Sequence, residues 1–254
     1  MRLFVLVLLA CLFAGEPIED DRLLAQGSGP RLTDCVGQGA TRDPASIVAA
    51  CSAVIADSEA PPSVLALALL NRGIAQAGQG DRAAALRDFK ESLRLRPTAE
   101  AYMARATVLA GGGDFAAARD DYDEAIRLSP RSAAAFNGRC RVRALIGQFG
   151  PAHRDCEISL MLRPDHPATL DSRGLVHLRL GQCADAVADF DAALARDTTL
   201  ASSLLGRGIC RLRQGDAVAG RRDLLAAEQL APGIVRRHLD WGILTPFEAV
   251  QGGP

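Results

Sequence analysis

The sequence has few of the residues from which nucleic-acid sites are usually built. Among its 254 residues are one tryptophan and two tyrosines, and Lys90 is the only lysine. So few aromatic rings provide no stacking platform for single strands, and a formal net charge of −1 gives no basic surface for a phosphate backbone. We therefore expect no nucleic-acid partner. The near absence of lysine favours a bacterial source with a genome rich in G and C.

Motifs for catalysis, metals and cofactors are missing as well. The chain has no Gly-x-Ser-x-Gly, no His-Glu-x-x-His, no phosphate-binding loop and no Cys-x-x-Cys pair, and its four histidines are scattered. The triplet at His153 to Asp155 resembles part of a kinase catalytic loop but lacks the other kinase motifs. We expect no catalytic residue, no metal and no cofactor. An enzyme with an unrecognised, distributed site is the less favoured alternative.

One long apolar run is present, at the start of the chain. Arg2 precedes the apolar residues 3–14, and the small residues Ala14 and Gly15 come before an acidic stretch. This pattern predicts a secretory signal peptide over residues 1–15, too short to span a membrane in the mature protein. It favours a periplasmic or secreted location. The alternative is a lipobox ending at Cys11, which would make the protein a lipid-anchored envelope assembly factor.

A glycine recurs every 33 or 34 residues, followed each time by a helical pattern rich in alanine. The five glycines are Gly80, Gly113, Gly147, Gly181 and Gly215. A period near 34 is typical of stacked helical hairpins, in which neighbouring units bury each other's apolar faces.

Small and large residues alternate in register within this period. Positions are counted within each repeat, with residue 66 as position 1 of the first. Position 8 holds Gly73, Ala106, Cys140, Gly174 and Gly208, and position 24 holds Phe89, Tyr122, Cys156, Phe190 and Leu224. These columns resemble the tetratricopeptide repeat family over about residues 66–232. The resemblance implies an all-α fold, a right-handed superhelical solenoid of stacked helix-turn-helix repeats.

The rest of the chain is divided around these repeats. We expect a signal peptide (1–15), a flexible segment (16–34), a half-repeat stapled by a disulfide (35–65), five repeats (66–232), a solvent-facing capping helix with a tail (233–248) and a flexible end (249–254).

Two charged columns accompany the apolar ones without exception. Position 7 is Arg72, Arg105, Arg139, Arg173 and Arg207, and position 23 is Asp88, Asp121, Asp155, Asp189 and Asp223. Because partly buried guanidinium groups need partners of opposite charge, the register predicts a ladder of Arg–Asp pairs rather than a row of ligand-binding arginines.

Six cysteines remain once Cys11 is removed with the signal, as expected for disulfides in an exported protein. Cys140 and Cys156 occupy facing positions of the third repeat, and Cys35 and Cys51 have the same spacing, so we predict these two disulfides. Cys183 and Cys210 both face a junction between repeats, and a third disulfide there is a weaker expectation.

The resemblance also implies where a partner would bind. In this family the first helices line the concave side, and here they carry ten arginines against two acidic residues. The expected partner-binding residues are Met103, Asn137, Arg141, Leu175, Leu178, Arg179, Leu205, Ile209, Leu212 and Arg213. Such an apolar and cationic groove suits a protein segment with apolar anchors and acidic groups. The sequence thus predicts a non-enzymatic scaffold or adaptor of the cell envelope.

Overall fold

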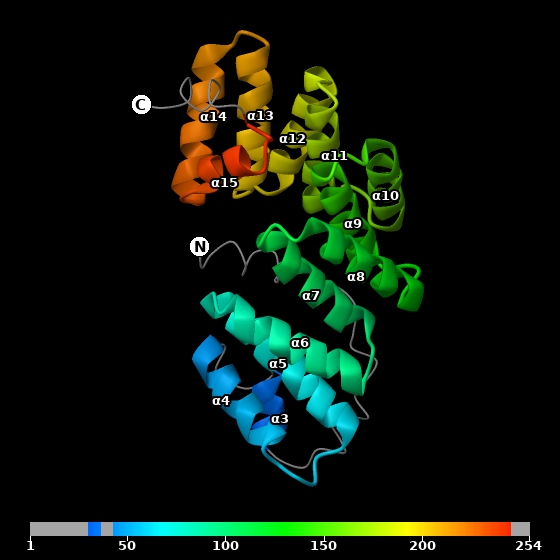
Figure 1. The fold of residues 1–254 in the computed structure, drawn as a ribbon. Coiled ribbons are helices and arrows are strands. Elements are labelled where there is room, and N and C mark those ends of the chain that lie inside the picture. The colour runs from blue at the N-terminus through cyan, green and yellow to red at the C-terminus, as the bar shows by residue number, and fades with distance from the viewer. Residues whose placement is uncertain (1–29, 37–42, 245–254) are drawn as a thin grey trace. The chain divides into compact units, whose positions relative to one another are not determined.

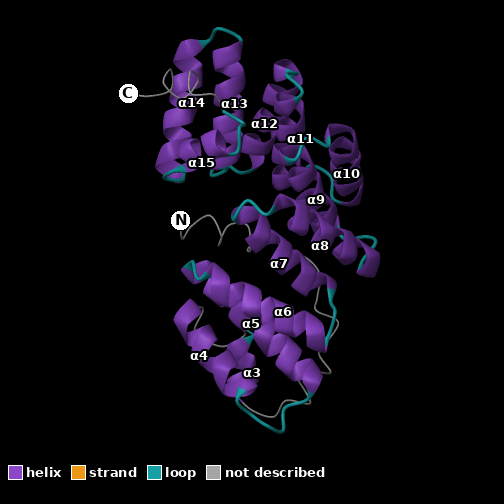
Figure 2. Cartoon of the chain, in the orientation of Figure 1, coloured by secondary structure: helices purple, strands orange, loops and turns teal. Residues whose placement is uncertain are grey.

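The computed structural model describes residues 30–36 and 43–244, and every regular element among them is an α-helix (Figure 2). The predicted signal peptide, Cys11 and the segment 249–254 lie outside the described residues. The chain divides at Pro130 into two compact units. The all-α class of stacked helical hairpins is confirmed.

The N-terminal unit begins with two helices and continues with two hairpins (Figure 1). Its helices are α3 (Pro30–Cys35), α4 (Pro44–Ile55), α5 (Pro62–Gln79), α6 (Arg82–Leu95), α7 (Ala99–Gly111) and α8 (Phe115–Leu128). The C-terminal unit has three hairpins and one more helix. Its helices are α9 (Ala133–Leu145), α10 (Phe149–Leu162), α11 (Pro167–Arg179), α12 (Cys183–Arg196), α13 (Ala201–Arg213), α14 (Ala217–Leu230) and α15 (Ile234–Asp240).

Local chemistry sets the helix ends. The side chains of Asp81 and Asp216 accept hydrogen bonds from backbone N–H groups in the first turns of α6 and α14, at 2.9 and 3.0 Å. All five periodic glycines have positive φ, from 76° to 89°, a conformation that favours glycine after the first helix of each hairpin. The glycine period therefore marks the turn inside every hairpin.

Close packing within the hairpins follows the small and large columns. The ring of Phe190 lies so near α11 and α13 that a Cβ atom added to Gly174 or Gly206 would come within 2.7 or 2.3 Å of it. Phe190 itself is 1 % exposed. These glycines thus allow three helices of adjacent repeats to pack around one buried ring.

The N-terminal end differs from the expected division into a flexible segment and a half-repeat. Residues 30–34, expected to be flexible, form helix α3 with Cys35, and α5 begins four residues before the expected start of the first repeat. Leu32 and Cys35 pack into one buried cluster with Cys51 and Val64. Burial of these apolar side chains orders a segment whose sequence has no helical period.

None of the helices formed by residues 30–36 and 43–244 is long and apolar enough to cross a membrane.

Candidate functional site

The predicted Arg–Asp ladder is present in every repeat. Each arginine donates from Nε and Nη2 to the two carboxylate oxygens of its aspartate, at 2.6–2.9 Å. The pairs are Arg72–Asp88, Arg105–Asp121, Arg139–Asp155, Arg173–Asp189 and Arg207–Asp223. The aspartates are 2–7 % exposed. The ladder arginines are therefore structural, as predicted.

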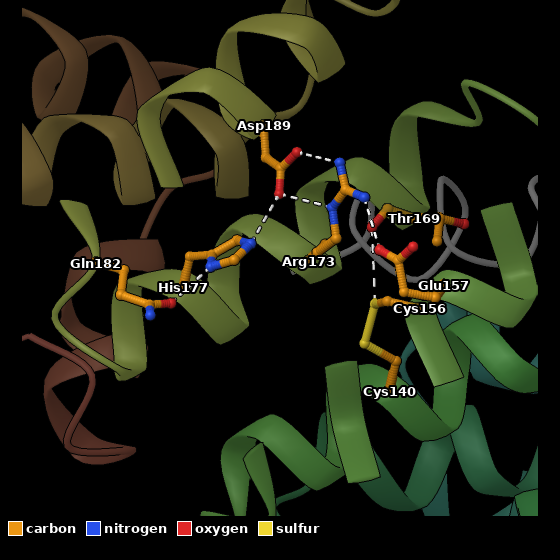
Figure 3. Close-up of polar contacts among 8 residues, drawn as sticks. All are labelled: Cys140, Cys156, Glu157, Thr169, Arg173, His177, Gln182 and Asp189. Atoms are coloured by element: carbon orange, nitrogen blue, oxygen red, sulfur yellow. Dashed lines mark hydrogen bonds and ion pairs between the residues drawn. A yellow bond between two sulfur atoms is a disulfide. The ribbon is translucent and has the colours of Figure 1, made fainter. Parts of the chain in front are cut away.

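A second cationic or imidazole group approaches the ladder carboxylate in the C-terminal unit. Arg143 donates to Asp155, and Arg211 donates to Asp223, both at 2.7 Å. His177 takes this place in the intervening repeat, with Nε2 3.7 Å from Asp189 (Figure 3). These side chains lie one helical turn after the ladder arginines, so the same face of each first helix supplies both groups.

Two ladder arginines also connect neighbouring repeats. Arg173 donates from Nη1 to Glu157 on α10 at 2.7 Å, and Figure 3 shows its guanidinium between Glu157 and Asp189. Arg207 contacts Asp191 on α12 in the same way. Hydrogen bonding to these carboxylates raises the pKa of both arginines, with Asp189 and Asp223 the main causes.

Three of the arginines that exceed the ladder on the first helices contact carboxylates. Arg143 and Arg211 bind ladder aspartates, and Arg141 on α9 donates to Asp171 on α11 at 2.7 Å. Arg179 and Arg213 make contacts of another kind. The Arg179 guanidinium lies over the ring of Phe149, 5.7 Å from its centre, and Arg213 donates to the Leu178 carbonyl at 3.4 Å.

The candidate site lies where α9, α11 and α13 present neighbouring faces in the C-terminal unit. We call it the first-helix face, and it comprises Arg141, Asp171, Leu175, Leu178, Ser202, Leu205 and Ile209. Asp171, at its polar centre, is 4 % exposed. Its carboxylate accepts hydrogen bonds from Arg141, from Ser202 at 2.9 Å and from Ser203 at 2.7 Å. The carboxylate thus joins three consecutive first helices.

Residues that follow the last repeat lie against this face. Figure 1 shows α15 next to α13 and α14, with which it is in contact. His238 on α15 and Ile243 after it line a small cavity together with the first-helix face. Ile234, His238, Ile243 and Leu244 are all buried, at 0–4 % exposure. We call residues 234–244 the C-terminal segment.

This arrangement differs from the expected open groove. The expected capping helix is present as α15, which contacts the last repeat and has Arg236 in solvent, but His238 on it is buried. Four apolar side chains expected to face a ligand are almost fully buried: Leu175 at 6 %, Leu178 and Leu205 at 1 %, and Ile209 at 0 %. Their side chains face an occupied surface, because His238 and Ile243 of the C-terminal segment line the same cavity. A signal was present in the sequence, since Ile243 and Leu244 form an apolar pair just after a glycine, where a polar tail is usual.

The other expected partner-binding residues lie outside the first-helix face, except Arg141. Met103, in the N-terminal unit, is 8 % exposed. Asn137 and Leu212 are partly buried, and Arg213 is exposed. Arg179 is partly buried at the end of α11. Arg179 and Arg213 therefore form the cationic part of the expected site that lies outside the cluster around Asp171.

His238 is fixed by its own helix. Its Nδ1 donates to the Ile234 carbonyl at 2.9 Å, so the lone pair of the neutral ring is on Nε2. Burial lowers the pKa of His238 to about 4, against the hydrogen bond to Ile234, which raises it; Arg141 and Arg237 lower it further and Asp171 raises it. The imidazole is therefore neutral near pH 7.

The cavity at this site is too small for a substrate. The cavity between the first-helix face and the C-terminal segment has a volume of about 10 Å³, comparable to one water molecule. Within the described part of the chain, no cluster of three or more histidine, cysteine or acidic side chains could hold a metal ion. The arrangement suits contact between polypeptide segments.

The structure joins the two predicted cysteine pairs. Cys35–Cys51 has an S–S distance of 2.11 Å, and Cys140–Cys156, which links α9 to α10, has one of 2.00 Å. The third expected pair does not form a disulfide. Cys210 is buried within α13, whereas Cys183 is the half-buried first residue of α12, and a shared junction does not by itself bring two Cβ atoms to bonding geometry.

Comparison with known proteins identifies the repeat. A sequence profile of the tetratricopeptide repeat family matches residues 70–133 and 172–233, one stretch beginning in each unit. With the helical hairpins at the same period, these matches identify the chain as a member of the tetratricopeptide repeat family. Among curated protein sequences, none matches this chain.

Solved structures share the fold at low sequence identity. A tetratricopeptide repeat protein of Thermus thermophilus aligns with 70 % of this chain and 97 % of its own, at 19 % identity and a TM-score of 0.60. One from Parabacteroides merdae aligns over 88 % and 98 %, at 18 % identity and 0.59. YrrB, a tetratricopeptide repeat protein with an unusual peptide-binding site, aligns over 80 % and 97 %, at 16 % identity and 0.52.

Proposed function

We propose that this protein is a non-catalytic scaffold that binds segments of other proteins on the first helices of its repeats. The observation that carries this proposal is the C-terminal segment itself. Residues 234–244, which include one short helix, lie with His238 and Ile243 against residues of α9, α11 and α13, and both side chains are buried. A surface that accommodates such a segment of its own chain has the chemistry to accommodate one from a partner.

The scaffold is proposed to work in the cell envelope. The apolar run at residues 3–14 supports export, and two cysteine pairs at disulfide distance suit an oxidising compartment. Attachment through a lipidated Cys11 is the alternative. Metabolic labelling with palmitate separates the two, because only the lipoprotein would incorporate label, and Cys11→Ser would abolish it.

Arg179 and Arg213 provide the test of partner binding. Both are the last residues of first helices, and their charges would pair with acidic groups flanking the apolar part of a ligand. The experiment is crosslinking in the native cell, followed by affinity capture and mass spectrometry. It compares wild type with the double variant Arg179→Glu, Arg213→Glu.

A matched control is available on the second helix of the last repeat. Arg221 and Arg222 are exposed on α14, so Arg221→Glu, Arg222→Glu makes the same charge change away from the first helices. We expect a partner that is lost from the Arg179, Arg213 variant and kept by the control, with unchanged circular dichroism for both. Equal capture by all three proteins would refute binding at the first helices.

A further inference from the structure

The C-terminal segment reaches its place through a sharp reversal. Glu228 accepts hydrogen bonds from the backbone N–H groups of Gly233 and Val235, at 2.5 and 3.2 Å, which fixes the entry into α15. At the other end, the His238 carbonyl accepts from the N–H groups of Ile243 and Leu244, at 2.9 and 3.2 Å. The chain after α15 therefore turns back toward His238, and Ile243 lines the same cavity as the imidazole.

The surroundings of this segment, rather than its own helical propensity, keep it ordered. Helix α15 has seven residues, and isolated helices shorter than about twelve residues are marginal in water. Its outward side chains are solvated, since Arg236 is 81 % exposed and its ion pair with Asp240 is a surface pair. Buried contacts with α13, α14 and the first-helix face supply the attraction, so the segment docks much as a separate peptide would.

The charges beneath the segment are already satisfied. Asp171 accepts three hydrogen bonds, one of them from Arg141, and His238 is neutral. A ligand that brought an unpaired carboxylate or ammonium group to this point would lose its hydration without gaining a partner. The face therefore selects apolar side chains and an uncharged hydrogen-bonding group.

We propose that the C-terminal segment is an internal ligand that a partner must displace, and that the partner offers a short helix with the same chemistry. That helix carries an apolar residue at the place of Ile234, an uncharged polar ring or amide one turn later, and an apolar pair after a reversal. This inference rests on the proposed function, because it assigns the ligand class for the same face. With a tethered competitor, the apparent affinity for an external ligand equals its intrinsic affinity multiplied by the fraction of molecules in which the face is open.

The test uses the full chain and a fluorescein-labelled peptide with the sequence of residues 232–244. The variant Ile243→Glu, Leu244→Glu puts charges where the internal segment must be buried, and so opens the face. The matched control Arg236→Glu changes an exposed residue of the same segment. Fluorescence anisotropy then gives the Kd of the peptide for wild type, the opened variant and the control.

We expect the opened variant to bind the peptide at least about tenfold more tightly than wild type or Arg236→Glu. Adding Leu205→Asp to the opened variant should abolish binding, which places the peptide on the first-helix face. Circular dichroism and the thermal transition identify a variant that has failed to fold. For that case, amide hydrogen exchange of the wild-type chain provides a second readout. Added peptide should speed exchange at residues 234–244 and slow exchange at none of these residues.

Three results would overturn the inference. The first is equal peptide affinity for wild type and a folded opened variant, which means that the segment does not compete. The second is no peptide binding to either protein. The third is a wild-type dimer that the peptide dissociates, which means that the segment comes from a second copy. None of these results decides the capture experiment with Arg179 and Arg213, so the inference can fail while the proposed function stands.

Discussion

His238 and Asp171 line the same small cavity, although one lies on α15 and the other on α11. The arrangement sets a neutral imidazole near a buried carboxylate whose charge is balanced by Arg141 and by two serine hydroxyl groups. It ties the last helix of the chain to the centre of the first-helix face. The stability of this packing therefore decides whether the face is covered.

Acidification should loosen the C-terminal segment. The pKa of His238 is lowered from 6.5 to about 4, so the undocked segment binds a proton more readily than the docked one. The equilibrium constant for docking of the segment is at its maximum above pH 6.5. It falls as the pH is lowered toward 4, by at most about tenfold per pH unit. Arg141 and Arg237 favour the neutral ring, and Asp171 opposes them.

Trp241, the only tryptophan, reports this change because its ring centre lies 5.2 Å from that of His238. We expect its emission maximum to shift to longer wavelength as the pH falls from 6.5 to about 4, while far-ultraviolet circular dichroism stays constant. In His238→Gln the pH-dependent shift should disappear. An identical shift in that variant would assign it to another group.

Removing one partner of a ladder pair should cost much more than removing both. Asp223→Leu leaves the guanidinium groups of Arg207 and Arg211 without their buried acceptor, and a loss of about 3–5 kcal/mol is typical of a broken buried pair. Arg207→Met combined with Asp223→Leu should recover part of that loss. Urea denaturation measures both. The exposed pair Arg236–Asp240 is the control, and Asp240→Asn should leave the midpoint nearly unchanged.

Cysteine accessibility should follow the structure. Non-reducing peptide mapping is expected to find Cys35 linked to Cys51 and Cys140 linked to Cys156. In the native protein an alkylating reagent should label the half-buried Cys183, and it should reach the buried Cys210 only after unfolding. Loss of the Cys140–Cys156 link in a double Cys→Ala variant should lower stability by about 3 kcal/mol in the chain-entropy description. A Cys183–Cys210 peptide in the native digest would contradict this assignment.

Filling the space beside Phe190 should destabilise the C-terminal unit. In Gly206→Ala the new methyl group would lie 2.3 Å from the ring, and overpacking of this kind typically costs about 1–3 kcal/mol. Phe190→Leu should partly rescue the variant by making room. Gly150, on α10, has nothing within 4 Å of an added Cβ, so Gly150→Ala should be neutral or stabilising. Thermal unfolding of the wild type and these three variants distinguishes the outcomes.

The repeats made the ladder predictable from sequence. Arg207 and Asp223 are sixteen residues apart, as are the partners in every other repeat, so a single hairpin geometry accounts for all five pairs. The same register places Cys140 opposite Cys156. The position of His238 has no such periodic basis, because α15 occurs once and its place near Asp171 brings together distant parts of the chain. Helix α15 was predicted to cap the last repeat and does contact α13 and α14, but only the tertiary structure shows that His238 and Ile243 also reach the first-helix face.

Arg207 has a consequence for the order in which the C-terminal unit comes apart. Its guanidinium holds Asp191 of the fourth repeat and Asp223 of the fifth at once, at 2.7 Å each. Detachment of α14 would separate Arg207 from Asp223, and detachment of α13 would separate it from Asp191. Fraying should therefore start at α15 and pause there, with the last hairpin released only when the repeat beneath it gives way.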